Sequence, residues 1–164
     1  MSQSLHVFVI GASGLIGNEV VKMLVDLSVN DTRVVLRGVC DSKTAIYLRD
    51  SSVIPGWKVN KDVRWRVSDY ASSSSIEQFD YDGSREALQS FTVCVPPLHS
   101  SFDSNISRGS ANTCIATVII DCTASEVPSS LYGSWLSAGI HVVTANKKGQ
   151  CLQLKLTLLI EFSS

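Results

Sequence analysis

The chain has 164 residues, of which 45% are hydrophobic and 18% are charged, and its formal net charge is −1. This composition is typical of a globular domain with a buried core and excludes a disordered chain. The near-zero charge excludes broad electrostatic attraction to nucleic acid or to an anionic membrane, and no apolar run in the sequence is long enough to span a bilayer.

The first predicted unit is a strand, a turn, a helix and a second strand. His6–Ile10 is a continuous apolar run, as expected for a strand that is covered on both faces. Residues 18–27 place their valines and leucines on one helical face, and Val34–Cys40 is an apolar strand that ends at Asp41. The pattern predicts a βαβ unit with a right-handed crossover.

The middle of the chain gives weaker signals. We interpret Thr44–Leu48 as a short helical turn. Ser75 is a candidate cap for a short helix over Ile76–Phe79, and Ser84–Phe91 predicts a further helix with Leu88 facing inward.

The last predicted unit is strand, turn, helix and strand. Thr117–Asp121 is apolar and stops at a small polar turn, and Ile140–Thr144 is the next apolar run. The helix between them ends at Gly139, which suits a left-handed carboxyl cap. Its apolar face consists of Val127, Leu131, Trp135 and Ala138. The whole pattern predicts an α/β fold with a doubly wound, mostly parallel sheet, in which ligands bind at the carboxyl ends of the strands.

A turn with three glycines joins the first predicted strand to its helix. Glycine lets the backbone approach a pyrophosphate closely, and the amino end of the helix that follows carries a partial positive charge. Because the turn lies between a buried strand and a helix, we predict nucleotide binding rather than a purely structural turn. The predicted cofactor-binding residues here are Gly11, Ser13, Gly14, Leu15, Ile16 and Gly17.

Asp41 ends the second predicted strand, where a carboxylate reads the ribose hydroxyls of NAD and repels the 2′-phosphate of NADP. Arg37 and Lys43 are close in sequence and are candidates for binding such a phosphate. A helix cap or a solvated turn residue is the alternative role for Asp41. The pattern favours NAD and leaves NADP open.

Thr123, Ala124 and Ser125 follow the strand that ends at Asp121. Small side chains would let the ribose and nicotinamide side of a cofactor approach the backbone, and the hydroxyls would add hydrogen bonds. An ordinary helix start capped by Ser125 is the alternative, and the two roles are compatible.

The segment from Ile120 to Gly149 contains a characteristic set of residues, Asp121–Ser125, Trp135, Leu136, Gly139–Thr144 and Asn146–Lys148. In these residues the segment resembles the nucleotide-binding domain of homoserine dehydrogenase, in both its single-function and its aspartokinase-fused forms. The likeness is weaker over residues 7–41. It implies a Rossmann-like NAD(P)-binding domain over residues 1–150 and a divergent tail over residues 151–164, with no counterpart of the family's substrate domain.

The resemblance implies the cofactor half of an enzyme that interconverts aspartate 4-semialdehyde and homoserine, on the route to threonine, methionine and isoleucine. It places Lys147 beside the nicotinamide and the substrate as a catalytic residue, since a fixed ammonium stabilises the charge that hydride transfer builds on oxygen. It gives Asn146 the role of orienting this loop. The family usually has proline where this chain has Ala145, which makes the loop less rigid. Because the family's second lysine and substrate carboxylates lie in the substrate domain, we predict binding of NAD or NADP without turnover.

Two other functions remain open. The glycine spacing also occurs in semialdehyde dehydrogenases and extended short-chain dehydrogenases, although none of the four tyrosines has a lysine four positions later, as the short-chain form requires. A non-enzymatic product that binds cofactor or the full-length subunit is the second alternative. The predicted partner is a nicotinamide dinucleotide, with an amino-acid substrate only if the substrate domain is supplied.

The five cysteines are scattered and form no Cys-x-x-Cys pair, which predicts a reducing compartment. Residues 1–5 carry no export signal, and we therefore expect a cytoplasmic protein. The three histidines lack the spacing of metal ligands, and we predict no metal site.

Overall fold

The computed structural model describes residues 3–30, 33–48, 76–93 and 113–148, which form one α/β unit. Its strands are β1 (Gln3–Ile10), β2 (Val34–Cys40), β3 (Thr44–Leu48), β4 (Ile76–Asp80), β5 (Thr113–Asp121) and β6 (His141–Thr144). Its helices are α1 (Leu15–Asn30), α2 (Arg85–Val93), α3 (Glu126–Ser129) and α4 (Tyr132–Ser137).

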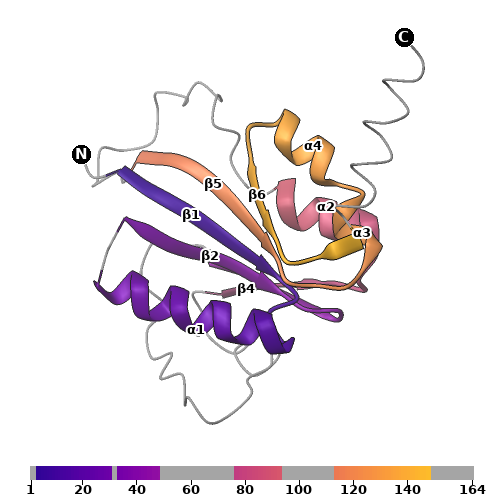
Figure 1. Cartoon of the computed structure of the whole chain (residues 1–164), viewed down its shortest axis with the longest axis horizontal. Helices are drawn as coiled ribbons and strands as arrows, with labels where there is room; N and C mark the ends of the chain where they lie inside the picture. The colour runs from indigo at the N-terminus through magenta and orange to yellow at the C-terminus, as the bar shows by residue number, and fades with distance from the viewer. Residues whose placement is uncertain (1–2, 31–32, 49–75, 94–112, 149–164) are drawn as a thin grey trace.

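The strands lie side by side in one sheet, in the order β4-β3-β2-β1-β5-β6 (Figure 1). The central strand β1 pairs in parallel with β2 and β5, and β5 pairs in parallel with β6. β3 is antiparallel to both β2 and β4, so β4 points the same way as the parallel strands. The carboxyl ends of β1, β2, β4, β5 and β6 therefore meet at one edge of the sheet.

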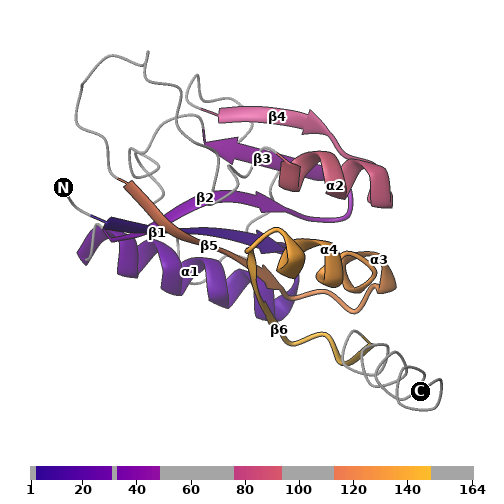
Figure 2. The same cartoon turned by 90° about the horizontal axis from the view of Figure 1, so that it is seen from above.

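Helices cover both faces of the sheet (Figures 1 and 2). On one face, Val21 and Val25 of α1 pack with Val7 and Val9 of β1. On the other face, α2, α3 and α4 surround a second core, which includes Phe8, Phe91, Leu131 and Trp135. Alternate residues of β1 thus serve opposite cores, as a strand covered on both faces requires. The predicted α/β fold, doubly wound on a mostly parallel sheet, is confirmed.

The structure corrects two predictions in the middle of the chain. Thr44–Leu48 is strand β3 rather than a helical turn, because a tight turn after Cys40 folds the chain back along β2. Ile76–Phe79 lies in strand β4 rather than in a short helix, and it pairs with β3. Strand preference depends on the neighbour that a segment pairs with, and a local pattern does not contain that neighbour.

The single helix predicted between β5 and β6 is also corrected, because it is two short helices, α3 and α4. The hydroxyls of Ser129 and Ser130 donate to the carbonyls of Glu126 and Val127, each at 2.8 Å. Such bonds compete with the helical hydrogen-bond ladder. Gly139 follows α4 with a φ of 77°, the left-handed conformation that its sequence position predicted.

The predicted helix over Ser84–Phe91 is present as α2. The tail predicted over residues 151–164 lies outside the described residues. Within the part of the chain that the structure describes, no helix has both the length and the apolar character needed to cross a membrane.

Candidate functional site

A cavity of about 470 Å³ opens at the carboxyl edge of the sheet. Its volume falls within the range of about 300–1,000 Å³ that is typical of small-molecule sites. The turns after β1, β2, β4 and β5 all contribute to its wall, because these strands end at the same edge. The residues that were predicted from the sequence and that line it are Gly11, Ser13, Gly14, Asp41, Thr123, Ala124 and Ser125.

Gly11 brings the turn after β1 against the turn after β5. Its φ of 79° is left-handed, and a Cβ at this position would lie 2.8 Å from Thr123 Cγ2. Gly14 donates its N–H to the carbonyl of Gly11 at 3.0 Å, and its own carbonyl accepts the N–H of Asn18 at 2.9 Å. Backbone atoms therefore form much of this wall of the cavity.

Three residues predicted with this turn do not line the cavity. Gly17 is buried, and a Cβ there would lie 2.1 Å from the carbonyl oxygen of Gly11, so this glycine lets α1 pack against the turn. Leu15 and Ile16 are 79% and 53% exposed at the start of α1. A contact between these three residues and a cofactor remains a prediction.

Asp41 lines the cavity and also holds the hairpin turn between β2 and β3. Its Oδ1 accepts the N–H groups of Lys43 and Thr44 at 2.8 and 2.9 Å. Its Oδ2 accepts a hydrogen bond from Ser13 Oγ at 2.7 Å. The carboxylate therefore joins the glycine turn to the hairpin. Asp41 thus has the turn role that the sequence left open and also a place in the wall of the cavity.

The turn after β5 forms the opposite wall. Thr123 donates its N–H to Oδ1 of the fully buried Asp121 at 2.8 Å. Ser125 caps α3, since its Oγ accepts the N–H of Val127 at 3.2 Å. Ala124 and Ser125 are exposed at the cavity, where their small side chains leave the backbone accessible.

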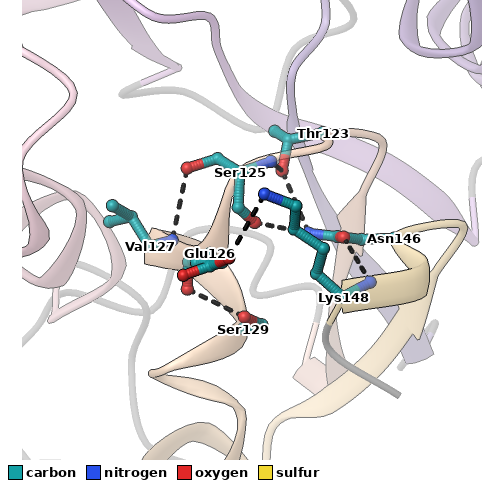
Figure 3. Close-up of polar contacts among 7 residues, drawn as sticks. All are labelled: Thr123, Ser125, Glu126, Val127, Ser129, Asn146 and Lys148. Carbon is teal, nitrogen blue, oxygen red and sulfur yellow. Dashed lines mark hydrogen bonds and ion pairs between the residues drawn. The ribbon is translucent and has the colours of Figure 1, made fainter. Parts of the chain in front are cut away.

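Asn146 ties the loop after β6 to this wall (Figure 3). Its Nδ2 donates to the carbonyl of Ser125 at 2.6 Å and lies 3.4 Å from Thr123 Oγ1. Asn146 and Lys147 are not among the lining residues, but Asn146 contacts two residues that are. The glycine turn packs against the β5 turn, and the lysine loop is hydrogen-bonded to the β5 turn. Both segments therefore contact the same wall of the cavity.

The two lysines of this loop differ in their surroundings. Lys148 is exposed and forms an ion pair with Glu126 at 3.2 Å (Figure 3). Exposed pairs of this kind contribute at most about 1 kcal/mol. Lys147 is exposed and has no hydrogen-bond or ion-pair partner among the described residues. It is the lysine of the two whose ammonium group remains available.

Tyr81 and Gly83 also line the cavity, from the turn after β4. The sequence pattern does not predict them, because interpreting Ile76–Phe79 as a helix removes the strand that ends at this edge. The Asp82-Gly83 pair is a turn signal, and Gly83 has a φ of 77°. That signal marks a turn but not the edge of the sheet on which the turn lies.

Cys122 lines the cavity, and its chemistry tests one alternative function. Burial raises the pKa of its thiol to about 11, and the neighbouring Asp121 carboxylate adds to the shift. No histidine is among the described lining residues. The described cavity therefore lacks the activated Cys–His pair that a semialdehyde dehydrogenase would need. The described residues also contain no group of three His, Cys, Asp or Glu side chains that would hold a metal ion.

Comparison with known proteins finds matches to homoserine dehydrogenases. Residues 83–161 match the family model described as "Homoserine dehydrogenase, NAD binding domain". Two similar proteins are the chloroplastic bifunctional aspartokinase/homoserine dehydrogenase of Daucus carota, 58% identical over 33 residues, and the chloroplastic bifunctional aspartokinase/homoserine dehydrogenase 2 of Arabidopsis thaliana, 53% identical over 32 residues. Each match covers 20% of this chain and 4% of the relative.

A solved structure, the homoserine dehydrogenase of Thermoplasma acidophilum, aligns with 90% of this chain at 19% sequence identity and a TM-score of 0.43. The alignment covers 36% of that protein, so this chain spans about a third of its length.

The matched residues 83–161 include the β5 turn and the Asn146-Lys147 loop, on which the sequence resemblance depends. The predicted cofactor class, NAD or NADP, agrees with the NAD binding for which this family model is named. The predicted likeness is confirmed: residues 83–161 of this chain match the model of the homoserine dehydrogenase NAD-binding domain.

Proposed function

We propose that this chain binds a nicotinamide dinucleotide in the cavity and forms the cofactor-binding part of a homoserine dehydrogenase. The observation that carries the proposal is the meeting of three predicted features at one cavity, namely the glycine turn after β1, Asp41 after β2 and Thr123–Ser125 after β5. Asn146 connects the lysine loop to the last of these. The family match supports the same cofactor class.

The walls of the cavity fit the parts of a dinucleotide. The backbone of Gly11 and Gly14 would hold the pyrophosphate, since little side chain intervenes and the amino end of α1 adds a partial positive charge. Asp41 would accept hydrogen bonds from the adenosine ribose. Thr123 and Ala124 would then face the nicotinamide nucleoside, which is the opposite end of the same molecule.

Lys147 is the residue that we assign to the chemistry. A bound nicotinamide would supply or accept the hydride that interconverts aspartate 4-semialdehyde and homoserine. The Lys147 ammonium would stabilise negative charge on the substrate oxygen. Asn146 would hold the loop in place even though Ala145 occupies the position where the family usually has proline. The biosynthesis of threonine, methionine and isoleucine is the pathway that this assignment implies.

We further propose that NAD is preferred to NADP. The carboxylate of Asp41 would repel a 2′-phosphate. Arg37, one of two candidate phosphate ligands, lies 3.2 Å from His6 Nε2 and is not among the described lining residues. Lys43 is exposed on the hairpin and is the remaining candidate.

Titration of the purified chain with NADH and NADPH, followed by nicotinamide fluorescence, tests the proposal. We expect saturable binding, with NADH bound more tightly. Ala124→Leu adds bulk at an exposed residue that lines the cavity and should weaken binding of both cofactors. Ala138→Leu makes the same change at an exposed residue outside the lining and is the matched control. Absence of binding, or equal binding by the wild type and Ala124→Leu, would contradict the assignment of this cavity.

We also propose that these 164 residues bind cofactor without turnover. The resemblance assigns a second lysine and the substrate carboxylates to another domain of the family. Steady oxidation of NADH or NADPH in the presence of aspartate 4-semialdehyde would disprove this part of the proposal.

A further inference from the structure

A buried carboxylate lies behind the β5 wall of the cavity. Asp121 is the last residue of β5 and has no exposed surface. It accepts hydrogen bonds from the Thr123 N–H at 2.8 Å, from Tyr132 Oη at 2.5 Å and from Asn146 Nδ2 at 3.2 Å. A buried carboxylate is costly unless donors surround it, so these three bonds strongly favour one arrangement of their partners.

Tyr132 and Thr144 extend this set of contacts to α4 and β6. Thr144 Oγ1 lies 2.8 Å from Tyr132 Oη and accepts the N–H of Asn146 at 2.9 Å. Burial, followed by the hydrogen bond to Asp121, raises the pKa of Tyr132, so its hydroxyl keeps the proton that it donates. The resulting group is the Asp121 network, which consists of Asp121, Tyr132, Thr144 and Asn146.

The Asp121 network holds the backbone on both sides of Lys147. Thr144 accepts the N–H of Asn146, and Asn146 Oδ1 accepts the N–H of Lys148 at 3.1 Å. Asn146 Nδ2 also donates to the carbonyl of Ser125 at 2.6 Å. The exposed Lys147 side chain thus projects from a loop whose neighbouring peptide groups are fixed.

The contacts of the network lie on one side of the cavity. Thr123 and Ser125, to which the network bonds, line the wall formed by the β5 turn. On the other side, Ser13 donates to Asp41, and Asp41 holds the β2–β3 hairpin. The two walls are therefore supported by different sets of hydrogen bonds.

We propose that Tyr132 and Thr144 are positioning residues, which act through Asp121 and Asn146 to hold Lys147 and the β5 turn at the nicotinamide end of the site. Neither Tyr132 nor Thr144 is among the residues that line the cavity. This inference rests on the proposed cofactor function. It requires that loss of a network hydroxyl weaken binding at the nicotinamide end and leave the ADP end unchanged, whereas a general structural role would weaken both.

Calorimetric titration with NADH and with ADP, which lacks the nicotinamide nucleoside, separates these roles. We expect Tyr132→Phe and Thr144→Val each to weaken NADH binding about 5- to 10-fold, the effect of losing one buried hydrogen bond, and to change ADP binding less than about twofold. Thr144→Ser retains the hydroxyl and should bind NADH like the wild type. Tyr47→Phe removes a hydroxyl from a tyrosine that stacks on Phe8 outside the network, and it should change neither affinity.

Three results would overturn the inference: equal weakening of NADH and ADP binding in both variants, unchanged NADH binding in both, or a wild type that binds NADH no more tightly than ADP. A wild type that binds neither ligand would overturn the proposed function instead, and the inference with it. Circular dichroism shows whether each variant is folded, and Thr144→Val decides the matter if Tyr132→Phe does not fold.

Discussion

Gly17 supports the glycine turn after β1 through packing rather than through contact with the cavity. In Gly17→Ala the new Cβ would lie 2.1 Å from the carbonyl oxygen of Gly11 and 2.9 Å from Ala12 Cα. Both are backbone atoms, which cannot move aside as the end of a flexible side chain can. We expect a loss of about 1–3 kcal/mol in the free energy of unfolding, measured in urea, because overpacking displaces backbone.

Gly133→Ala is the matched control for Gly17→Ala. A Cβ at Gly133 meets nothing within 4 Å, and the residue lies within α4. The control should gain about 0.5–1 kcal/mol, since alanine is the better helix former. Wild-type stability in Gly17→Ala would show that α1 does not depend on this close approach.

Asp41 has a structural task and an electrostatic one, and a single substitution separates them. In Asp41→Asn the amide oxygen can still accept the N–H groups of Lys43 and Thr44, but the negative charge is lost. We expect the ratio of NADPH to NADH affinity to rise about tenfold, while the free energy of unfolding changes by less than about 1 kcal/mol. Titration with both cofactors measures the ratio. Asp26→Asn removes the same charge from an exposed residue of α1, and an equal rise there would indicate a general charge effect.

At the scale of elements, the sequence predicts best what is determined locally. Apolar runs bounded by polar turns identify β1, β2, β5 and β6, because each strand carries this signal in its own residues, although no residue of β6 is fully buried. β3 and β4 are not predicted, since they are strands only through pairing with β2 and with each other. The last predicted helix is divided between Ser129 and Tyr132, where the hydroxyls of Ser129 and Ser130 bond to backbone carbonyls that an apolar pattern does not predict.

The same distinction applies to the site. Gly11, Gly14 and Asp41 are predictable, because a turn between a strand and a helix, or an acid at a strand end, has a local signature. Tyr81 lines the cavity only because β4 points the same way as β2, and that direction follows from tertiary pairing. The contact of Tyr132 with Asp121 is not predictable from the sequence, because only the folded chain brings the Tyr132 hydroxyl to this carboxylate.

Gly139 forms the junction between α4 and β6, and we expect it to control the stability of this part of the fold. Its φ of 77° is left-handed, so Gly139→Ala should lower the free energy of unfolding by about 1–2 kcal/mol. Gly139→Asn should lose less, because asparagine tolerates this conformation better. Urea unfolding of the two variants gives the comparison, and equal losses would mean that something other than the backbone conformation is responsible.

At the scale of the whole molecule, the cavity and a separate buried polar cluster lie toward opposite ends of the strands. The cavity is at the carboxyl ends of the strands. Near the amino end of β1, His6 Nε2 lies 3.2 Å from Ser4 Oγ and 3.2 Å from a guanidinium nitrogen of Arg37. Substitutions in this cluster should therefore change folding stability without changing cofactor affinity.

His6 should make that stability depend on pH. Burial, with the Arg37 charge adding to it, lowers the pKa of His6 from 6.5 to about 4. Between these values the unfolded chain binds a proton that the folded chain does not. The contribution of His6 is therefore complete above about pH 6.5 and is lost as the pH falls toward 4. A shift of this size corresponds to at most about 3 kcal/mol, and residual solvation reduces it to roughly 1–2 kcal/mol.

Urea unfolding of the wild type, His6→Gln and His141→Gln between pH 7 and pH 4 tests this dependence. His6→Gln should flatten the fall in the free energy of unfolding, because it removes the group that titrates only in the unfolded chain. His141 is exposed on β6, so His141→Gln should keep the wild-type slope. NADH affinity at pH 7 should be the same in both variants, since neither residue lines the cavity. If His6→Gln and the wild type lose stability in parallel, the acid sensitivity arises from carboxylates elsewhere, and the cluster at the amino end of β1 does not restrict protonation.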